Sequence, residues 1–180
     1  HPRATHSGVN QPNTRVMHMA GQGEGTRQRL VEHLWRGQDP LRGFPANLFE
    51  PDLQGWNSEH QYLAESIQQL CPAVIVEVGV WKGSSTIFMA QTAKSLGLST
   101  VVIAIDTWLG SHEHWLHEPY FAEMSFFHGY PALYYKFLSN VVRADVADHV
   151  LPIPIDSVNA AEILRAFGVS ATMIHLDGAH

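Results

Sequence analysis

The sequence is poor in cysteine, in positive charge and in long apolar runs. Its 180 residues contain one cysteine, Cys71, which excludes an internal disulfide bond. Lysine and arginine number 11 against 17 acidic residues, and the net charge of -6 gives no electrostatic reason to expect nucleic acid or an anionic membrane as a partner. No uncharged apolar run approaches the ~20 residues of a membrane helix, and no signal-peptide pattern opens the chain. We therefore expect one globular domain in the cytoplasm.

The first 57 residues lack the alternating pattern that follows them. Residues 1–23 are polar and aperiodic, which is typical of a flexible arm. Residues 24–36 place apolar side chains on one face of a predicted helix. Residues 38–57 are rich in proline and glycine and are predicted to be loop. Residues 1–57 are thus interpreted as an arm, a short helix and a loop that precede the main domain.

From residue 58 onward, helical patterns alternate with apolar runs. Ser58 and Gln61 have the spacing of a capping box for the first of these helices. Strands separated by helices predict an α/β fold with a doubly wound parallel sheet, covered on both faces, over residues 58–180. Two prolines in the third strand indicate an edge strand or a short one. The predicted helices are 59–70, 84–96, one or two within 113–143, and 158–167; the predicted strands are 74–78, 101–105, 150–155 and 172–176.

The sequence stops at the tip of the fourth predicted strand, in Asp177-Gly-Ala-His180. A functional loop is expected at such a place, and a doubly wound sheet of four strands is small. We expect the domain to be incomplete at its C-terminus. An incomplete sheet exposes an edge, which favours pairing with a second copy of the chain as a homo-oligomer.

The first predicted strand leads into the most informative segment of the chain. Glu77 lies near the end of the strand, Gly79 and Gly83 follow, and Ser84 and Ser85 begin a helical pattern. Glycines let the backbone turn tightly and approach a ligand without an intervening Cβ atom. The amides of the two serines lie at a helix N-terminus and can donate to a carboxylate or a hydroxyl group. This combination predicts a ligand site beyond the strand.

A second acid, Asp106, ends the next predicted strand, and the carboxyl ends of parallel strands are where ligands bind in such sheets. Its carboxylate can accept hydrogen bonds from both hydroxyls of a ribose. The glycine spacing is G-x-x-x-G and not the dinucleotide fingerprint G-x-G-x-x-G. Glu77 would repel a pyrophosphate but attract an ammonium group. These features favour S-adenosylmethionine over NAD.

Four ordered motifs resemble those of class I S-adenosylmethionine-dependent methyltransferases. The likeness covers about residues 54–180 and is strongest for the small-molecule branch whose fourth strand ends in Asp-Gly-x-His. It implies an enzyme that transfers a methyl group from S-adenosylmethionine to an oxygen of a small-molecule acceptor, with help from a divalent cation such as Mg²⁺ in several related branches. The motifs span 77–85, 105–108, 156–157 and 175–180.

The resemblance implies that Glu77 and Gly79 line the methionine end of the cofactor and that Asp106 holds the ribose. Asp156 and Ser157 would lie near the adenine, although both are also favoured caps for the helix that follows them. The complete set assigned to cofactor binding is Glu77, Gly79, Gly83, Ser84, Ser85, Asp106, Thr107, Trp108, Asp156 and Ser157.

The resemblance also implies catalytic roles for Asp177 and His180. Asp177 would lie at the reacting centre, where related enzymes place a ligand of a divalent metal, and His180 would orient that carboxylate or serve as a base. The family's sheet has seven strands and a further acidic pair that completes its metal site. The given residues show neither the remaining strands nor that pair, so we expect at most one of the usual metal carboxylates among them, Asp177.

A histidine-rich segment, residues 112–118, permits other interpretations. It fails the zinc motif H-E-x-x-H because position 116 is leucine. His114 and His117 could share a metal or supply a base, but a cover over the site is favoured. The aromatic residues of this region serve either core packing or an acceptor pocket. Two other functions also stay open: a nicotinamide-dependent oxidoreductase and a non-catalytic module that binds a nucleoside ligand.

Overall fold

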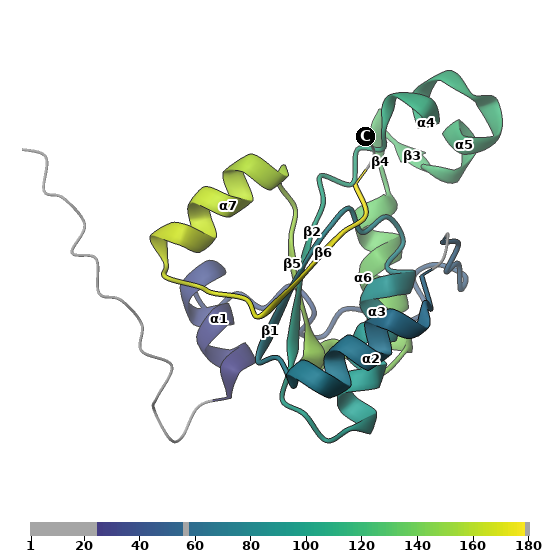
Figure 1. The fold of residues 1–180 in the computed structure, drawn as a ribbon. Coiled ribbons are helices and arrows are strands. Elements are labelled where there is room, and N and C mark those ends of the chain that lie inside the picture. The colour runs from purple at the N-terminus through teal and green to yellow at the C-terminus, as the bar shows by residue number, and fades with distance from the viewer. Residues whose placement is uncertain (1–24, 56–57, 179–180) are drawn as a thin grey trace, which may run out of the picture.

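The computed structural model describes residues 25–55 and 58–178. Its centre is a parallel sheet in the order β5-β2-β1-β6 (Figure 1). The register pairs Val78 with Ile105, which brings the residues that follow β1 and β2 to the same edge of the sheet. The strands are β1 (Val74–Val78), β2 (Val101–Ile105), β5 (Val150–Ile153) and β6 (Met173–Leu176).

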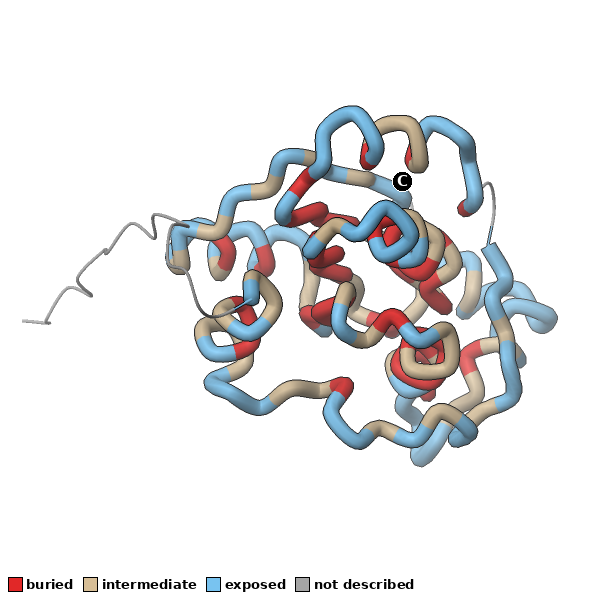
Figure 2. Tube along the Cα trace, turned by 90° about the horizontal axis from the view of Figure 1, so that it is seen from below, coloured by how far each residue is buried: buried red, intermediate tan, exposed pale blue. Residues whose placement is uncertain are grey.

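Helices cover both faces of this sheet, which confirms the predicted doubly wound α/β fold (Figure 1). One face packs against α1 (Thr26–Leu34) and α7 (Ser157–Ala166). The other packs against α2 (Gln61–Leu70), α3 (Ser84–Ser95) and α6 (Leu133–Arg143). Figure 2 shows the buried residues gathered between the sheet and these two layers.

Side chains alternate between the two faces, as the pleat of a strand requires. In β1, Val74 and Val76 belong to the core under α1 and α7, whereas Ile75 belongs to the core under α3. Glu77 shares the side of Ile75, so its carboxyl group enters a largely apolar interface and is fully buried.

A segment of residues 112–131, called the insertion below, lies beyond the carboxyl ends of the strands (Figure 1). The one or two helices predicted within 113–143 are interrupted near Gly129 by a hairpin that the sequence analysis did not foresee. The insertion consists of α4 (His112–Leu116), α5 (Glu118–Glu123) and the hairpin of β3 (Phe126–Phe127) and β4 (Tyr130–Pro131).

Two local predictions need correction. The N-cap of α2 is His60, whose ring accepts a hydrogen bond from the Tyr62 amide at 3.3 Å, so the predicted capping box of Ser58 is wrong. The third predicted strand ends at Ile153 because the chain turns before α7, and it follows a 3-10 turn, η1 (Ala147–His149). It is short and lies at the edge of the described sheet, as its prolines predicted. Within the described ranges, no helix is long and apolar enough to cross a membrane.

Candidate active site

Residues 79–83, called the elbow below, connect β1 to α3. Gly79 (φ 83°) and Gly83 (φ 90°) occupy the left-handed region that favours glycine. A Cβ atom on Gly79 would lie 2.5 Å from the backbone of Gly178, and one on Gly83 would lie 2.6 Å from the Phe137 ring. Both glycines are therefore required by the tight turn, as predicted, and also by neighbouring protein atoms. The approach of a ligand, the other predicted reason, stays a prediction.

Asp106 closes the elbow against the tip of β2. One carboxylate oxygen accepts hydrogen bonds from the amides of Val80 and Trp81 at 2.8 and 3.0 Å, and the other accepts from the amide of Trp108 at 2.8 Å. A carboxylate offers about four acceptor positions. Three are taken by the backbone, so Asp106 retains about one for a ligand hydroxyl.

The N-terminus of α3 follows directly on the elbow. Its N-cap is Gly83, and no side chain caps the helix. The first amides of α3 thus carry the positive end of the helix dipole without a side-chain partner. Ser84 is half-buried, whereas Ser85 is buried and donates its hydroxyl to Glu77. The backbone of these serines, and not the Ser85 hydroxyl, suits an anionic group.

Glu77 lies beneath this helix. Its carboxyl group accepts hydrogen bonds from the hydroxyls of Ser85 and Thr86, and His175 lies 4.0 Å away. Burial raises the pKa of Glu77 to about 7, and the charges of Asp177 and Asp106 act in the same direction. No part of Glu77 is exposed, so contact between its carboxylate and a cofactor ammonium group remains a prediction.

The two residues after Asp106 differ in exposure. Trp108 is fully buried, and its indole donates a hydrogen bond to the backbone oxygen of Trp81 at 2.8 Å. Its ring also packs against Phe137, which makes it a support beneath the elbow. Thr107 is half-buried and its hydroxyl accepts from the amide of Leu109 at 3.3 Å. A cofactor contact stays a prediction for both residues.

Asp156 is the N-cap of α7. Its carboxylate accepts from the backbone amide of Asn159 at 3.0 Å and from the side-chain amide of the same residue at 2.6 Å. These hydrogen bonds lower the pKa of Asp156. The capping alternative is confirmed, and Ser157 is the first residue of the helix. Adenine contact by either residue is compatible with capping and stays a prediction.

Asp177 lies at the tip of β6, next to the tip of β1. Its amide donates to the backbone oxygen of Val78 at 2.8 Å, and its side chain is exposed. His180 lies outside the described residues. Within the described part of the chain, no three His, Cys, Asp or Glu residues are grouped closely enough to hold a metal ion. The divalent cation at Asp177 stays a prediction.

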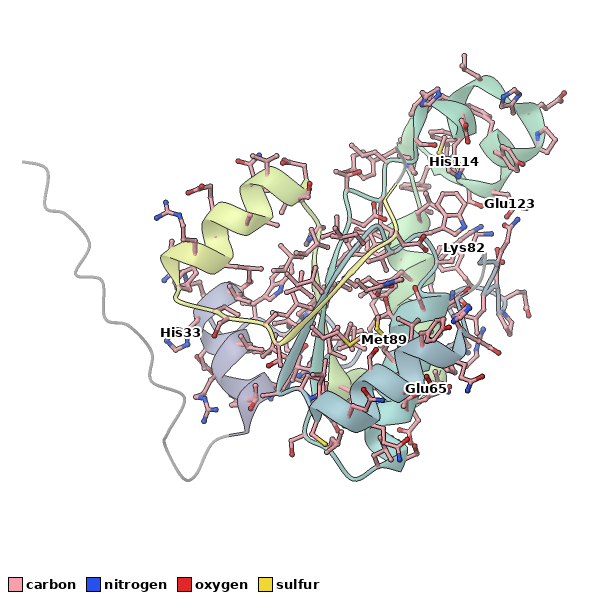
Figure 3. All side chains as sticks on the ribbon, viewed as in Figure 1. His33, Glu65, Lys82, Met89, His114 and Glu123 are labelled. Atoms are coloured by element: carbon pink, nitrogen blue, oxygen red, sulfur yellow. The ribbon has the colours of Figure 1, made fainter. Side chains whose placement is uncertain are left out.

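His114 lies between the insertion and the elbow. Its ring stacks on Trp81 with the centroids 4.2 Å apart, and its Nδ1 accepts a hydrogen bond from the amide of Ser111 at 3.0 Å (Figure 3). Burial lowers the pKa of His114, which favours the neutral ring. Because Nδ1 is the acceptor, Nε2 carries the hydrogen and is a donor. This geometry opposes the less favoured alternative in which His114 serves as a general base.

Two hollows adjoin the N-terminus of α3, with volumes of about 240 and 560 Å³. Both are lined by Leu53, Glu59 and Ser84, and neither is lined by Gly79 or Asp106. Open space thus lies beside the α3 end of the elbow. The convergent polar groups lie at the tips of β1 and β2, which is where parallel sheets bind ligands.

Comparison with known proteins identifies the class. The family model described as Methyltransferase domain matches residues 76–180, which is more than half of the chain. The chain therefore belongs to the methyltransferase domain family. Membership confirms the resemblance noted in the motifs, while the Asp-Gly-x-His branch remains a prediction. No curated protein matches the chain significantly.

Two solved structures are similar to this chain at low sequence identity. An O-methyltransferase from Bacillus cereus in complex with SAH is 18% identical, over 80% of this chain and 50% of its own, with a TM-score of 0.39. A proposed O-methyltransferase from Klebsiella pneumoniae is 18% identical, over 78% of this chain and 47% of its own, with a TM-score of 0.37. This chain spans about half the length of either protein, and likeness at this level carries no functional argument.

Proposed function

We propose that this chain binds S-adenosylmethionine at the tips of β1 and β2 and serves methyl transfer to an oxygen of a small molecule. One observation carries the proposal. A helix N-terminus without a side-chain cap and a carboxylate that retains an acceptor position both adjoin the elbow, in a chain of the methyltransferase domain family.

The residues suit the parts of this cofactor. The first amides of α3 would hold its carboxylate, since anions bind at helix N-termini. Asp106 would accept a ribose hydroxyl with its remaining position. S-adenosylmethionine supplies an electrophilic methyl group on its sulfonium when bound. The elbow would fix the distance and direction of attack, and such orientation is a large source of rate.

The acceptor side would be formed by the tip of β6 and the insertion. Asp177 is exposed beside β1 and is our candidate for receiving the proton of an acceptor hydroxyl. His114 would contribute a hydrogen-bond donor through Nε2, which can orient an oxygen of the acceptor.

Isothermal titration calorimetry with S-adenosylmethionine tests the proposal. We expect saturable binding that Asp106→Ala weakens by a factor of about 100 or more, because hydrogen bonds to a charged group are strong. The matched control is Asp148→Ala, an exposed acid on η1 that should leave binding unchanged. Equal affinity in the two variants would refute the ribose assignment. Binding of NADH, followed by its fluorescence, would favour the oxidoreductase alternative instead.

A further inference from the structure

Lys82 of the elbow is fully buried, although lysine is rarely buried without partners. Its Nζ donates to carboxylate oxygens of Asp52 and Glu123, both at 2.5 Å, and to the side-chain oxygen of Gln54 at 3.1 Å (Figure 3). Three acceptors match the three hydrogens of the ammonium group. The lysine thus has a complete set of partners.

These partners come from separate segments of the chain. Asp52 and Gln54 belong to the loop before α2, and Glu123 is the last residue of α5 in the insertion. Lys136 of α6 donates to the backbone oxygen of Glu123 at 2.9 Å and lies 4.0 Å from the Asp52 carboxylate. Two lysines therefore face two carboxylates, and the group is balanced in charge.

The backbone around Lys82 is also held by α6. The side-chain amide of Asn140 donates to the backbone oxygen of Lys82 at 3.0 Å and to that of Asp52 at 2.7 Å. Asn140 is itself buried. The loop, the elbow and α6 consequently meet at one point, and α5 joins them through Glu123.

Consecutive elbow residues hold the two helices of the insertion. Trp81 stacks against His114 of α4, and Lys82 binds Glu123 of α5. Met124 also anchors the insertion in the core, whereas Trp115 and Leu116 of the same segment are exposed. Trp81 and Lys82 therefore add polar and aromatic ties between the elbow and the two insertion helices, beside the apolar anchor of Met124.

We propose that Lys82 is a positioning residue that fixes the insertion and the loop around Asp52 against the elbow. This inference rests on the proposed function, because the proposed function places the cofactor at the elbow and the acceptor at the insertion. Lys82 then sets the place of the acceptor wall relative to the methyl group. Without the charge of Lys82, the carboxylates of Asp52 and Glu123 would face each other, with Lys136 beside them at 4.0 Å from Asp52.

Hydrogen–deuterium exchange of the full chain tests this role. Lys82→Met should speed amide exchange in residues 118–124 and 50–54 by about tenfold or more, because hydrogen bonds to a charged group are lost. The matched control is Lys94→Met in the last turn of α3. The ion pair of Lys94 with Asp145 is largely exposed, so its loss should leave both segments unchanged. Unchanged exchange in Lys82→Met would overturn the proposal.

Glu123→Gln provides a milder variant, because this side chain is partly exposed and Lys82 stays in place. It should speed exchange in residues 118–124 more than in residues 50–54. Asp52→Asn should have the converse effect. Suppose both variants remain folded, but Glu123→Gln leaves amide exchange in residues 118–124 unchanged and Asp52→Asn leaves it unchanged in residues 50–54. The hydrogen bonds to Lys82 then do not hold these two segments.

S-adenosylhomocysteine separates positioning from a merely structural role. Binding to the wild type should slow exchange in residues 118–124, and Glu123→Gln should bind with similar affinity but lose this slowing. Equal slowing in both proteins would overturn the positioning role. Failure of the wild type to bind the compound would refute the proposed function, while exchange of the unliganded variants would still decide whether Lys82 holds the insertion.

Discussion

The elbow and the insertion meet through Trp81 with His114 and through Lys82 with Glu123, yet different interactions define each region. In the elbow, glycines in left-handed conformations and amides bound to Asp106 define the backbone itself. In the insertion, short helices contact the elbow through a few side chains, while Trp115 is 51% and Phe127 74% exposed. The comparison indicates that the elbow, our proposed cofactor side, tolerates little change, whereas the exposed side chains of the insertion, our proposed acceptor side, can vary at lower cost.

Among the variants that test this difference between the elbow and the insertion, Asp106→Ala should have the largest effect on stability. Loss of the carboxylate removes three hydrogen bonds from backbone amides, so we expect the free energy of unfolding to fall by about 4 kcal/mol. Urea denaturation followed by circular dichroism measures it. Asp148→Ala, the exposed control, should unfold like the wild type. Similar midpoints for the two variants would contradict the central role of Asp106.

Gly83→Ala tests the elbow from its other end. The added Cβ would meet the Phe137 ring at 2.6 Å in a backbone conformation with φ 90°, and we expect a loss of about 3 kcal/mol in unfolding free energy. Gly97→Ala is the matched control, since its φ is 69° but no atom lies within 4 Å of the new Cβ. It should cost only the backbone strain, about 1 kcal/mol. Equal losses would show that Phe137 yields freely.

Glu77→Gln tests how the stability contributed by the buried acid beneath the elbow depends on pH. The pKa of this buried acid is raised from 4.5 in the unfolded chain to about 7, so the folded state keeps its proton while the unfolded state loses it. Stability from Glu77 is therefore present at low pH and is lost as pH rises between these values. Relative to Glu77→Gln, the wild type should lose about 2 kcal/mol between pH 5 and pH 8.

Urea denaturation at both pH values measures the difference. Glu59→Gln, which changes an exposed glutamate, should run parallel to the wild type. A wild type that gains stability relative to Glu77→Gln on going to pH 8 would show that the carboxylate is stabilised when charged.

The smallest effect is expected in the insertion. Trp115 donates a hydrogen bond to Leu109 at 3.0 Å and contacts Phe121 and Phe126 at their ring edges. We expect Trp115→Ala to change the unfolding free energy by less than about 1 kcal/mol and to leave cofactor affinity unchanged. Leu116→Ala, at a more exposed neighbour, is the control. A loss comparable to that of Gly83→Ala would remove the distinction between the two regions.

The pattern of apolar residues along the chain predicted those helices and strands whose limits depend on which of their own residues are buried. The bounds of β1 and β2 were predicted to the residue, because each is a short run rich in β-branched residues that is followed by a glycine or an acid. The place of Asp106 beside the elbow followed from the rule for parallel sheets. The β3–β4 hairpin was missed because two residues per strand are too few to establish a period.

Contacts between distant segments lay beyond such reasoning. The partners of Lys82 are 30 and 41 residues away in sequence, and no spacing signals them. The same holds for Gly83, whose need for a bare backbone comes from Phe137 on α6. The hydrogen bond that makes His114 a donor at Nε2 was overlooked, although Ser111 three residues earlier is a usual capping signal.

The raised pKa of Glu77 would link the proposed binding of S-adenosylmethionine to the release of a proton. Its pKa is raised in part by the negative charges of Asp177 and Asp106, so a cationic sulfonium and ammonium brought to the strand tips would lower it again. Glu77 would then release a proton as the cofactor enters, and affinity would increase with pH. Calorimetry in buffers with different ionisation enthalpies would count that proton directly.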